Sequence, residues 1–564
     1  MDIGKMTVCG AAAGAVCAAG LAQAQDAPKG VVENASKKKP NIIFFITDDM
    51  MPYMFGFLPS GEKTILTPTI DKYAKEGVIM TNQHVTSPVC TPSRFTCLTG
   101  RFPSRSHFDW FKGEQKKYNG QTVVQWTTYI KLHPRRITPT VPDFLKKEGY
   151  VSGLVGKTHF IHPHKEWTKL PYDSDAYDPK IKATVKKNYQ VLKKAALACG
   201  FDYAESLYLG NPIEVGPHAL AAHNLDWIAM NAVKFIEQNK DKPFYLYVAS
   251  TIPHDKLEAD KAWNANPLAT TDWFLDKPLN VMPARSTLPE RIKKSGVKYK
   301  STRRFDEIAD MLWLDDMFAA IVNKLKELGL DDNTIIFFFN DHGQMAKGTV
   351  YQGGVADPSF VWKKGGFPCG HASDALVSNV DFVPTILDMA GVEKMPEGLD
   401  GKSFLPILEG KKKEVHDSLY FELGFSRGIR KGNWKYLALR YPDSVKNMSL
   451  EERKKVLAEY AKMRKDFYGE TWKNTDPMAP FSHIKAVPGG SDAEQPSMHK
   501  YPAYYDTDQL YDLSKDPDEQ VNLAKNPEYA GKLKEMKDEL KRYLDELPGN
   551  FAELKEERKE KQGK

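Results

Sequence analysis

The stretch that decides the fold is Asn41-Ile-Ile-Phe-Phe-Ile-Thr47, which is followed at once by Asp48-Asp49. A short, continuous apolar run of β-branched and aromatic residues is typical of a strand that is buried on both faces of a sheet. Three later runs, residues 150–155, 243–250 and 334–339, have the same character, and polar residues follow each of them. The four runs predict the central strands of one sheet.

Helical patterns separate these runs, as in residues 70–76, where Gly77 ends the pattern, and residues 305–328. Strands that alternate with helices indicate a mostly parallel sheet covered on both faces. From Val415 onward the pattern changes to short strand-like pieces and a charged helix over 528–547. The sequence therefore predicts an α/β fold, in which helices sandwich a large, mostly parallel or mixed sheet, followed by a smaller C-terminal α+β domain that contains an antiparallel sheet.

The chain is expected to contain four segments. Residues 1–24 have the features of a signal peptide, because Lys5 precedes an uncharged stretch that ends at the small-residue site Ala22-Gln23-Ala24. This predicts a periplasmic or secreted protein, and no later run is long and apolar enough to span a membrane. We expect a large domain over 40–414, a C-terminal domain over 415–547 and a charged, solvated tail over 548–564. Residues 487–497 are expected to form an exposed loop.

The composition is that of a globular protein. The 564 residues include 79 Lys and Arg against 73 Asp and Glu, a net charge of +6, with 41% hydrophobic and 27% charged residues. These values exclude a disordered, collagenous or coiled-coil chain, and the slight basic excess does not indicate a nucleic-acid partner. After removal of the signal peptide, the remaining cysteines are too few for a disulfide framework. Whether Cys199 pairs with Cys369 stays open.

Polar clusters follow all four predicted strands. They are Asp48-Asp49, Gly156-Lys157-Thr158-His159, Pro253-His254-Asp255 and Asn340-Asp341-His342-Gly343. The carboxyl ends of parallel strands meet at one edge of a sheet, where ligands bind in such folds. We expect the carboxylates of Asp48, Asp49 and Asp341 to repel one another there unless a hard divalent cation neutralises them.

The most informative short motif is Cys90-Thr91-Pro92-Ser93-Arg94. Pro92 favours the first turn of a helix and Gly100 a helix end, so Cys90 is expected at a helix N-terminus, where backbone N–H groups attract anions. A phosphatase-type thiolate nucleophile needs a longer spacing between cysteine and arginine than this motif has. A buried, inert cysteine is the other alternative.

In this motif the chain resembles the type I sulfatases of the alkaline phosphatase superfamily, whose signature is Cys-x-Pro-x-Arg. Cys90, Pro92 and Arg94 match it. The resemblance runs from about Pro40 to Leu547 and includes the strand-end clusters and Lys347-Gly348-Thr349-Val350-Tyr351-Gln352-Gly353-Gly354. It implies that residues 40–414 are the catalytic domain, and that a formylglycine-generating or maturase enzyme oxidises Cys90 to Cα-formylglycine.

The resemblance also implies the roles of the site residues. A Ca²⁺ ion is expected to bind Asp48, Asp49, Asp341, residue 90 and His342. His342 stands where some relatives carry Asn, and imidazole is an unusual Ca²⁺ ligand. Hydrated formylglycine would attack sulfur, His159 would deprotonate the remaining hydroxyl to expel sulfate, and His254, with Lys347 as a second candidate, would protonate the leaving alcohol. The expected catalytic side chains are Cys90, Arg94, Lys157, His159, His254 and Lys347.

A sulfated carbohydrate is the expected substrate. The segments between the shared motifs, residues 104–140, 160–194 and 257–304, contain aromatic and basic side chains that suit a sulfated sugar. Two alternatives remain. One is a phosphoester or phosphonate monoester hydrolase of the same superfamily, which relative rates on aryl sulfate and aryl phosphate would reveal. The other is a non-catalytic glycan-binding protein in which Cys90 is never oxidised.

Overall fold

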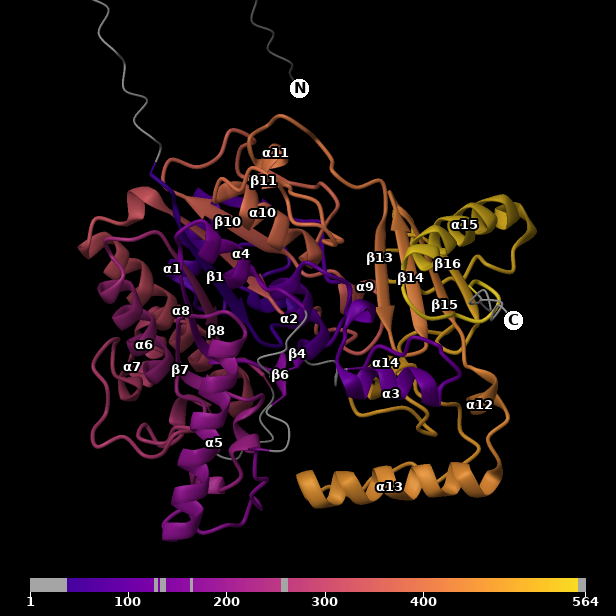
Figure 1. Cartoon of the computed structure of the whole chain (residues 1–564), viewed down its shortest axis with the longest axis horizontal. Helices are drawn as coiled ribbons and strands as arrows, with labels where there is room; N and C mark the ends of the chain where they lie inside the picture. Colours follow the sequence, from indigo (N-terminus) through magenta and orange to yellow (C-terminus); the bar gives the residue numbers. More distant parts are fainter. Residues whose placement is uncertain (1–37, 126–129, 132–137, 163–165, 255–261, 556–564) are drawn as a thin grey trace, which may run out of the picture. The chain divides into compact units, whose positions relative to one another are not determined.

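The computed structural model describes residues 38–125, 130–131, 138–162, 166–254 and 262–555 (Figure 1). The predicted signal peptide over 1–24 lies outside these residues. The described residues from Lys39 onward belong to one compact unit. Within the described part of the chain, no helix is long and apolar enough to cross a membrane.

The main sheet has eight strands in the order β11-β2-β10-β9-β1-β8-β5-β7. The four strands predicted from the sequence are its adjacent members β9, β1, β8 and β5, which run parallel, whereas β10 pairs antiparallel with β9 and with β2. The predicted mixed α/β sheet is confirmed. Its strands are β1 (Asn41–Thr47), β2 (Val78–Met80), β5 (Val151–Lys157), β7 (Tyr203–Tyr208), β8 (Phe244–Ala249), β9 (Thr334–Asn340), β10 (Ser359–Lys363) and β11 (Ala372–Ser373).

Strand β1 lies at the centre of the core, and all seven of its residues are buried. Its alternate side chains point to opposite faces of the sheet. On one face Phe45 packs edge-on against Phe318, and on the other Phe44 packs edge-on against Phe382, with ring centroids 5.2 and 5.1 Å apart. Burial of each such side chain contributes roughly 1.5–3 kcal/mol, which is why a continuous apolar run favours this central position.

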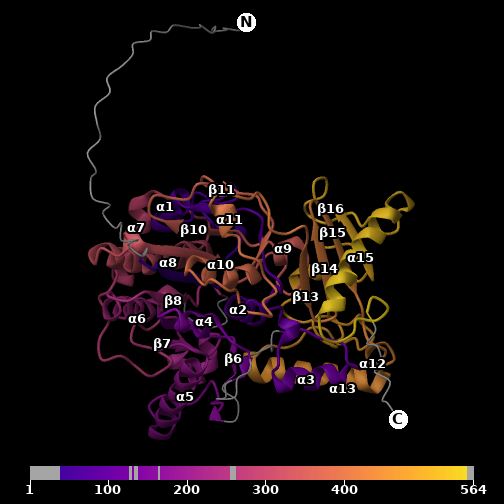
Figure 2. The ribbon, with the colours of Figure 1, turned by 45° about the horizontal axis from the view of Figure 1, so that its top comes forward.

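Helices cover both faces of the sheet, as Figure 2 shows. Phe318 belongs to α8 and Phe382 to α10, so these helices lie on opposite faces. Helices α1, α6 and α7 pack against α8, whereas α2 and α4 pack against α10; α5 packs on the edge strand β7. The helices are α1 (Pro68–Glu76), α2 (Cys90–Thr99), α4 (Val141–Lys147), α5 (Pro179–Ala198), α6 (Leu225–Gln238), α7 (Leu288–Ser295), α8 (Thr302–Glu327) and α10 (Phe382–Met389).

The C-terminal region contains the expected antiparallel sheet. Its four strands pair in the order β13-β14-β15-β16, and α15 packs on one face through Met536, Leu540 and Leu544. Phe421 and Leu437 join the core of the main sheet instead. The elements are β13 (Leu419–Leu423), β14 (Ser426–Lys431), β15 (Trp434–Leu439), β16 (Asp508–Asp512), α12 (Asp443–Lys446), α13 (Leu450–Tyr468), α14 (Gln495–Met498) and α15 (Ala530–Glu546).

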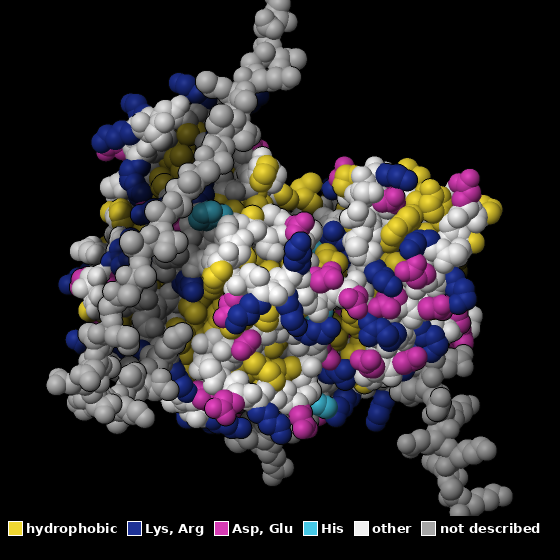
Figure 3. Space-filling view, turned by 90° about the horizontal axis from the view of Figure 1, so that it is seen from above, with side chains coloured by type: hydrophobic (Ala, Val, Ile, Leu, Met, Phe, Trp, Pro, Cys, Tyr) yellow, Lys and Arg dark blue, Asp and Glu magenta, His cyan; other side chains and the backbone are white. Residues whose placement is uncertain are grey.

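Short elements complete the described fold. Strand β3 pairs with β12, and β4 pairs with β6. On the face shown in Figure 3, basic and acidic side chains of the described residues are interspersed, in keeping with the small net charge. The elements are β3 (Gln83–His84), β4 (Ile130–Lys131), β6 (Ile161–His162), β12 (Val377–Ser378), α3 (Asp109–Lys117), α9 (Gln352–Val355) and α11 (Leu405–Leu408).

Two surface predictions are wrong. Residues 487–497 do not form an exposed loop, because Glu494 is fully buried and accepts hydrogen bonds from Ser491 Oγ, Tyr504 Oη and the His483 amide. Glycine, proline and serine indicate irregular backbone but not its exposure. The solvated tail does not begin at residue 548, because Phe551 is only 1% exposed and packs in the same cluster as α15. Residues 556–564 lie outside the described part.

The described cysteines, Cys90, Cys97, Cys199 and Cys369, are all free thiols. Cys199 is fully buried and Cys369 is partly exposed. The pairing that the sequence left open is therefore absent from this structure.

Candidate active site

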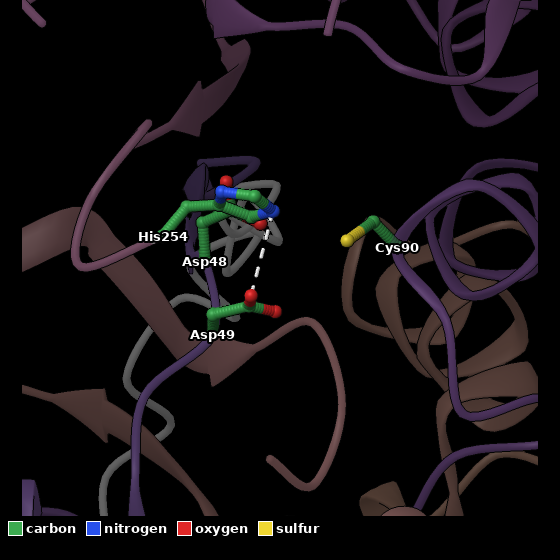
Figure 4. A group of neighbouring side chains, drawn as sticks. All are labelled: Asp48, Asp49, Cys90 and His254. Atoms are coloured by element: carbon green, nitrogen blue, oxygen red, sulfur yellow. Dashed lines mark ion pairs between the residues drawn. The ribbon is translucent and has the colours of Figure 1, made fainter. Parts of the chain in front are cut away.

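The carboxyl ends of β1, β5, β8 and β9 bring the predicted polar clusters together. Asp48 follows β1, Lys157 ends β5, and Asp341 follows β9. Lys157 Nζ donates a hydrogen bond to Asp48 Oδ2 at 2.5 Å, and the Asp49 amide donates to Asp341 Oδ1 at 3.2 Å. Figure 4 shows Asp48, Asp49 and His254 gathered on one side, with the sulfur of Cys90 pointing toward them.

Cys90 is the first residue of α2 and is only 2% exposed. Its Sγ lies 3.4 Å from His342 Nε2. Burial by itself raises the pKa of the Cys90 thiol, but Lys347, Lys157 and His342 outweigh this effect and hold that pKa well below its ordinary value. The helix N-terminus adds partial positive charge at the same point. The position of residue 90 therefore favours a negatively charged group.

Arg94 lies one turn after Cys90 on the same helix and is fully buried. Its Nη2 lies 3.3 Å from Asp48 Oδ1 and 3.2 Å from Asp341 Oδ2, and it donates a hydrogen bond to the Thr47 carbonyl at 3.1 Å. A buried guanidinium needs such partners, because an unpaired buried charge is strongly destabilising. Arg94 thus joins the loops that follow β1 and β9.

A β-bulge aims Lys157 into the site. The register between β5 and β7 shifts between Val155 and Gly156, and Gly156 has a φ of 93°. A Cβ at this glycine would lie 1.8 Å from the Ala249 carbonyl oxygen of β8. Only glycine fits both the positive φ and the close approach.

We expect Gly156→Ala to lower the free energy of unfolding by at least ~3 kcal/mol, because it combines backbone strain with a collision against a buried strand. Displacement of Lys157 should also lower catalytic turnover. Gly149→Ala is the matched control, since Gly149 has a φ of 82° but no atom within 4 Å of its added Cβ. Denaturant unfolding measures both variants, and equal losses of stability would contradict the assigned collision.

Asp49 is surrounded by three cationic or ionisable side chains. Lys347 Nζ contacts both of its carboxylate oxygens at 2.8 and 2.7 Å, and the Nε2 atoms of His254 and His342 lie 3.4 and 3.1 Å from them. Burial lowers the pKa of His254, but Asp49 more than offsets this, so that the pKa lies above its ordinary value. Asp49 thus stabilises the charged form of the His254 imidazole relative to the neutral form.

His159 completes the set of predicted residues. It lies close enough to Cys90 to help lower the pKa of that thiol, and its backbone amide donates to the Leu209 carbonyl at 2.7 Å. The structure thus gathers every predicted side chain around residue 90 and the three aspartates. They are Asp48, Asp49, Cys90, Arg94, Lys157, His159, His254, Asp341, His342 and Lys347.

The donor set fits a divalent cation. Ligand atoms of Asp49, Cys90, Asp341 and His342 all lie within 4.8 Å of one another, and an overlapping group contains Asp48 and His254. Carboxylate oxygens are the ligands that Ca²⁺ prefers. His342 Nδ1 lies 3.2 Å from the Gly343 carbonyl, which can only accept a hydrogen bond, so the neutral ring would turn the Nε2 lone pair toward the aspartates.

Two further residues hold the site together: Asn340, which belongs to a predicted cluster but was given no role, and Asn211, which was missed from the sequence. Asn340 accepts hydrogen bonds from Thr47 Oγ1 and the Met50 amide, and it donates to Asp357, so it joins the loops after β1 and β9. Asn211 accepts a hydrogen bond from Lys157 Nζ at 2.8 Å. Asn211 follows β7, and its position after a strand would have been the signal had that strand been recognised.

Comparison with known proteins identifies the family. The chain matches the family model described as Sulfatase over residues 40–392. The chain belongs to the sulfatase family. This confirms the resemblance to sulfatases of the alkaline phosphatase superfamily, and it makes the protein a sulfuric ester hydrolase.

Several known proteins are similar to this sulfatase in sequence or in fold. It is 27% identical over 522 residues to an ulvan-active sulfatase of Formosa agariphila, with 90% of this chain and 80% of that protein covered. It is 26% identical over 432 residues to an N-acetylglucosamine-6-O-sulfatase of Bacteroides thetaiotaomicron, with 67% and 73% covered. A solved structure from work on glycosaminoglycan metabolism by the same bacterium has the same fold, with a TM-score of 0.57, 20% identity and 90% and 99% covered.

Proposed function

We propose that this sulfatase is exported and removes sulfate from a sulfated carbohydrate, using a formylglycine made from Cys90 and a Ca²⁺ ion. One observation carries the proposal. The side chain of residue 90 lies at a helix N-terminus among three buried aspartates, and Arg94, Lys157 and Lys347 pair with those aspartates. This arrangement suits a charged nucleophile, a cation and an anionic ester in one place.

Asp48, Asp49, Asp341, residue 90 and His342 are proposed to hold the cation. When bound, Ca²⁺ supplies a Lewis acid that polarises an oxygen of the ester, and the aldehyde of formylglycine supplies a hydrated carbon with two hydroxyls. Asp48 and Asp49 already fix Lys157 and Lys347 by short contacts, so these cations need little reorganisation to meet a sulfuryl group. Arg94 is held in the same way.

Two histidines are proposed to move protons. His159 contacts residue 90 and is placed to accept a proton from that side chain. His254 lies on the other side of the cluster, where its Nε2 contacts Asp49, and it is proposed to donate a proton to the leaving oxygen of the alcohol. Lys347 contacts the same carboxylate and is a second candidate for that proton transfer.

The substrate class rests on the relatives. One relative is an ulvan-active sulfatase and another is an N-acetylglucosamine-6-O-sulfatase. We therefore propose that a sulfated oligosaccharide or polysaccharide is the natural substrate of this chain as well.

The test is sulfate release by protein that is produced together with a formylglycine-generating enzyme. We expect inorganic sulfate from at least one member of a panel of sulfated oligosaccharides, and slower hydrolysis of aryl phosphate and aryl phosphonate esters than of aryl sulfate. Mass spectrometry of the same sample should find an aldehyde at residue 90 and a mature N-terminus at Gln25. Sugar binding without sulfate release, or a thiol that stays unmodified, would contradict the proposal.

A further inference from the structure

A cavity of about 230 Å³ is lined by Trp167, Leu209 and Glu214 among others, and we call it the Trp167 pocket. Its walls come from two segments of the catalytic domain, residues 167–172 and 209–214, and from Asp466 near the end of α13. In Figures 1 and 2 the C-terminal end of α13 points toward β6 and α5, the elements that flank residues 167–172. The pocket therefore lies between the catalytic domain and the C-terminal region.

Hydrogen bonds connect this pocket directly to the active site. The Leu209 carbonyl accepts hydrogen bonds from the His159 amide at 2.7 Å and from Thr158 Oγ1 at 2.9 Å. Glu214 Oε1 accepts from the Asn211 amide at 3.1 Å, and Asn211 Oδ1 accepts from Lys157 Nζ at 2.8 Å. The segment that forms one wall of the pocket thus contacts the backbone of His159 and the side chain of Lys157.

The lining has the chemistry that binds a sugar ring. Trp167, Leu170 and Ile213 supply apolar surface, on which the C–H face of a sugar can pack, while Lys169, Glu214 and Asp466 supply polar groups for hydroxyls. The volume is below the roughly 300–1,000 Å³ of pockets for drug-sized ligands, so it suits one ring. Asp466 also pairs with Lys462 on α13, so the charges of Glu214 and Asp466 are balanced by those of Lys169 and Lys462.

Other tryptophans of the predicted specificity segments are engaged in packing. Trp263 donates its Nε1 hydrogen to Asp306 at 2.9 Å and packs edge-on against Phe305. Trp273 packs edge-on against Phe274, with Lys182 over its ring. Trp167 also packs against the main core, but among the described tryptophans of those segments it is the one that lines the Trp167 pocket.

We propose that the Trp167 pocket is a saccharide subsite, which binds the sugar ring next to the sulfated one in the substrate. This inference rests on the proposed function, because it concerns the carbohydrate part of a sulfate ester. It assigns to Trp167 and Asp466 a role in substrate selection that is separate from the chemistry at residue 90.

The experiment compares two substrates of the mature enzyme, a sulfated oligosaccharide from the panel and the small ester 4-nitrophenyl sulfate. Trp167→Ala should lower the ratio of kcat/KM on the oligosaccharide to kcat/KM on the aryl ester by about 10-fold, mainly through KM, because an aromatic contact is lost. Trp167→Phe keeps an aromatic face and should restore part of that ratio. Trp110→Ala is the matched control, since Trp110 is 40% exposed and does not line the pocket.

Asp466→Ala keeps the inference testable should Trp167→Ala fail to fold, because Asp466 is exposed on α13. It should lower the same ratio in the same direction. Equal effects on both substrates, or an unchanged ratio in both variants, would overturn the subsite. Failure of the proposed function would be seen earlier and separately, as absence of sulfate release from either substrate by the unchanged enzyme. The subsite would also be overturned if the enzyme hydrolysed the aryl ester but none of the oligosaccharides in the panel.

Discussion

Sulfate release by the Cys90→Ala variant is expected to fall by roughly 10⁶-fold, the order of loss that follows removal of the nucleophile from a serine hydrolase. The side chain of residue 90 lies at the N-terminus of α2, with its Sγ 3.4 Å from His342 Nε2, and it is the proposed source of the nucleophile. Alanine cannot be oxidised to an aldehyde. Release of sulfate from the accepted oligosaccharide, followed by ion chromatography, measures the loss.

Cys97→Ala is the matched control for this variant. Cys97 lies on the same helix and is also buried, but burial raises the pKa of its thiol, and it belongs to the apolar core. We expect Cys97→Ala to lower stability slightly, through the small cavity, and to leave activity near that of the unchanged enzyme. Retention of substantial activity by Cys90→Ala, or equal losses in the two variants, would contradict the assigned nucleophile.

Removal of divalent cations with a chelator should lower activity by on the order of 10³-fold, since a Lewis acid contributes several kcal/mol to charge stabilisation. Added Ca²⁺ should restore the activity. The chain should stay folded meanwhile, because Arg94, Lys157 and Lys347 already pair with the buried carboxylates of Asp48, Asp49 and Asp341. Circular dichroism and sulfate release, measured on the same samples, separate the two effects.

Asp49→Asn should raise the Ca²⁺ concentration needed for half of the maximal activity, because it removes one charged ligand. Asp332→Asn is the control, since the Asp332 side chain is 72% exposed and pairs with Lys364 at a distance from the site. Full activity in the presence of excess chelator would exclude a catalytic cation. Unfolding upon chelation would show instead that the three basic side chains do not suffice to balance the aspartates.

The central fold could be predicted because burial leaves a direct mark on the sequence. Strand β1 has the bounds that its apolar run indicates, and α2 ends before Gly100, which adopts a φ of 65°. Strand β7, Tyr203–Tyr208, was missed since its run is broken by Glu205 and by Ser206, which has a φ of 48°. The antiparallel partner β10 was also not predicted, because pairing direction is set by distant connections rather than by local residues.

Much of the site was predictable for a related reason. Each predicted group follows a recognisable strand or belongs to a motif, and parallel strands place their ends together. The pairings were not predictable, because the contact between Lys157 and Asp48 depends on the bulge at Gly156. Asn211 was not predicted because β7, the strand that it follows, was not predicted. The burial of Glu494 depends on hydrogen-bond partners that the composition of its segment does not reveal.

The near-complete burial of Cys90 has a consequence for the order of events during synthesis. Cys90 is buried in part by the side chain of His342, which lies 252 residues later in the chain. At about 5–20 residues per second, translation from one to the other takes on the order of 10–50 s. During that interval the ribosome has not yet made His342 or Lys347, so the cysteine cannot be enclosed. A modifying enzyme that works within this interval meets an open chain, whereas one that arrives later meets a closed protein.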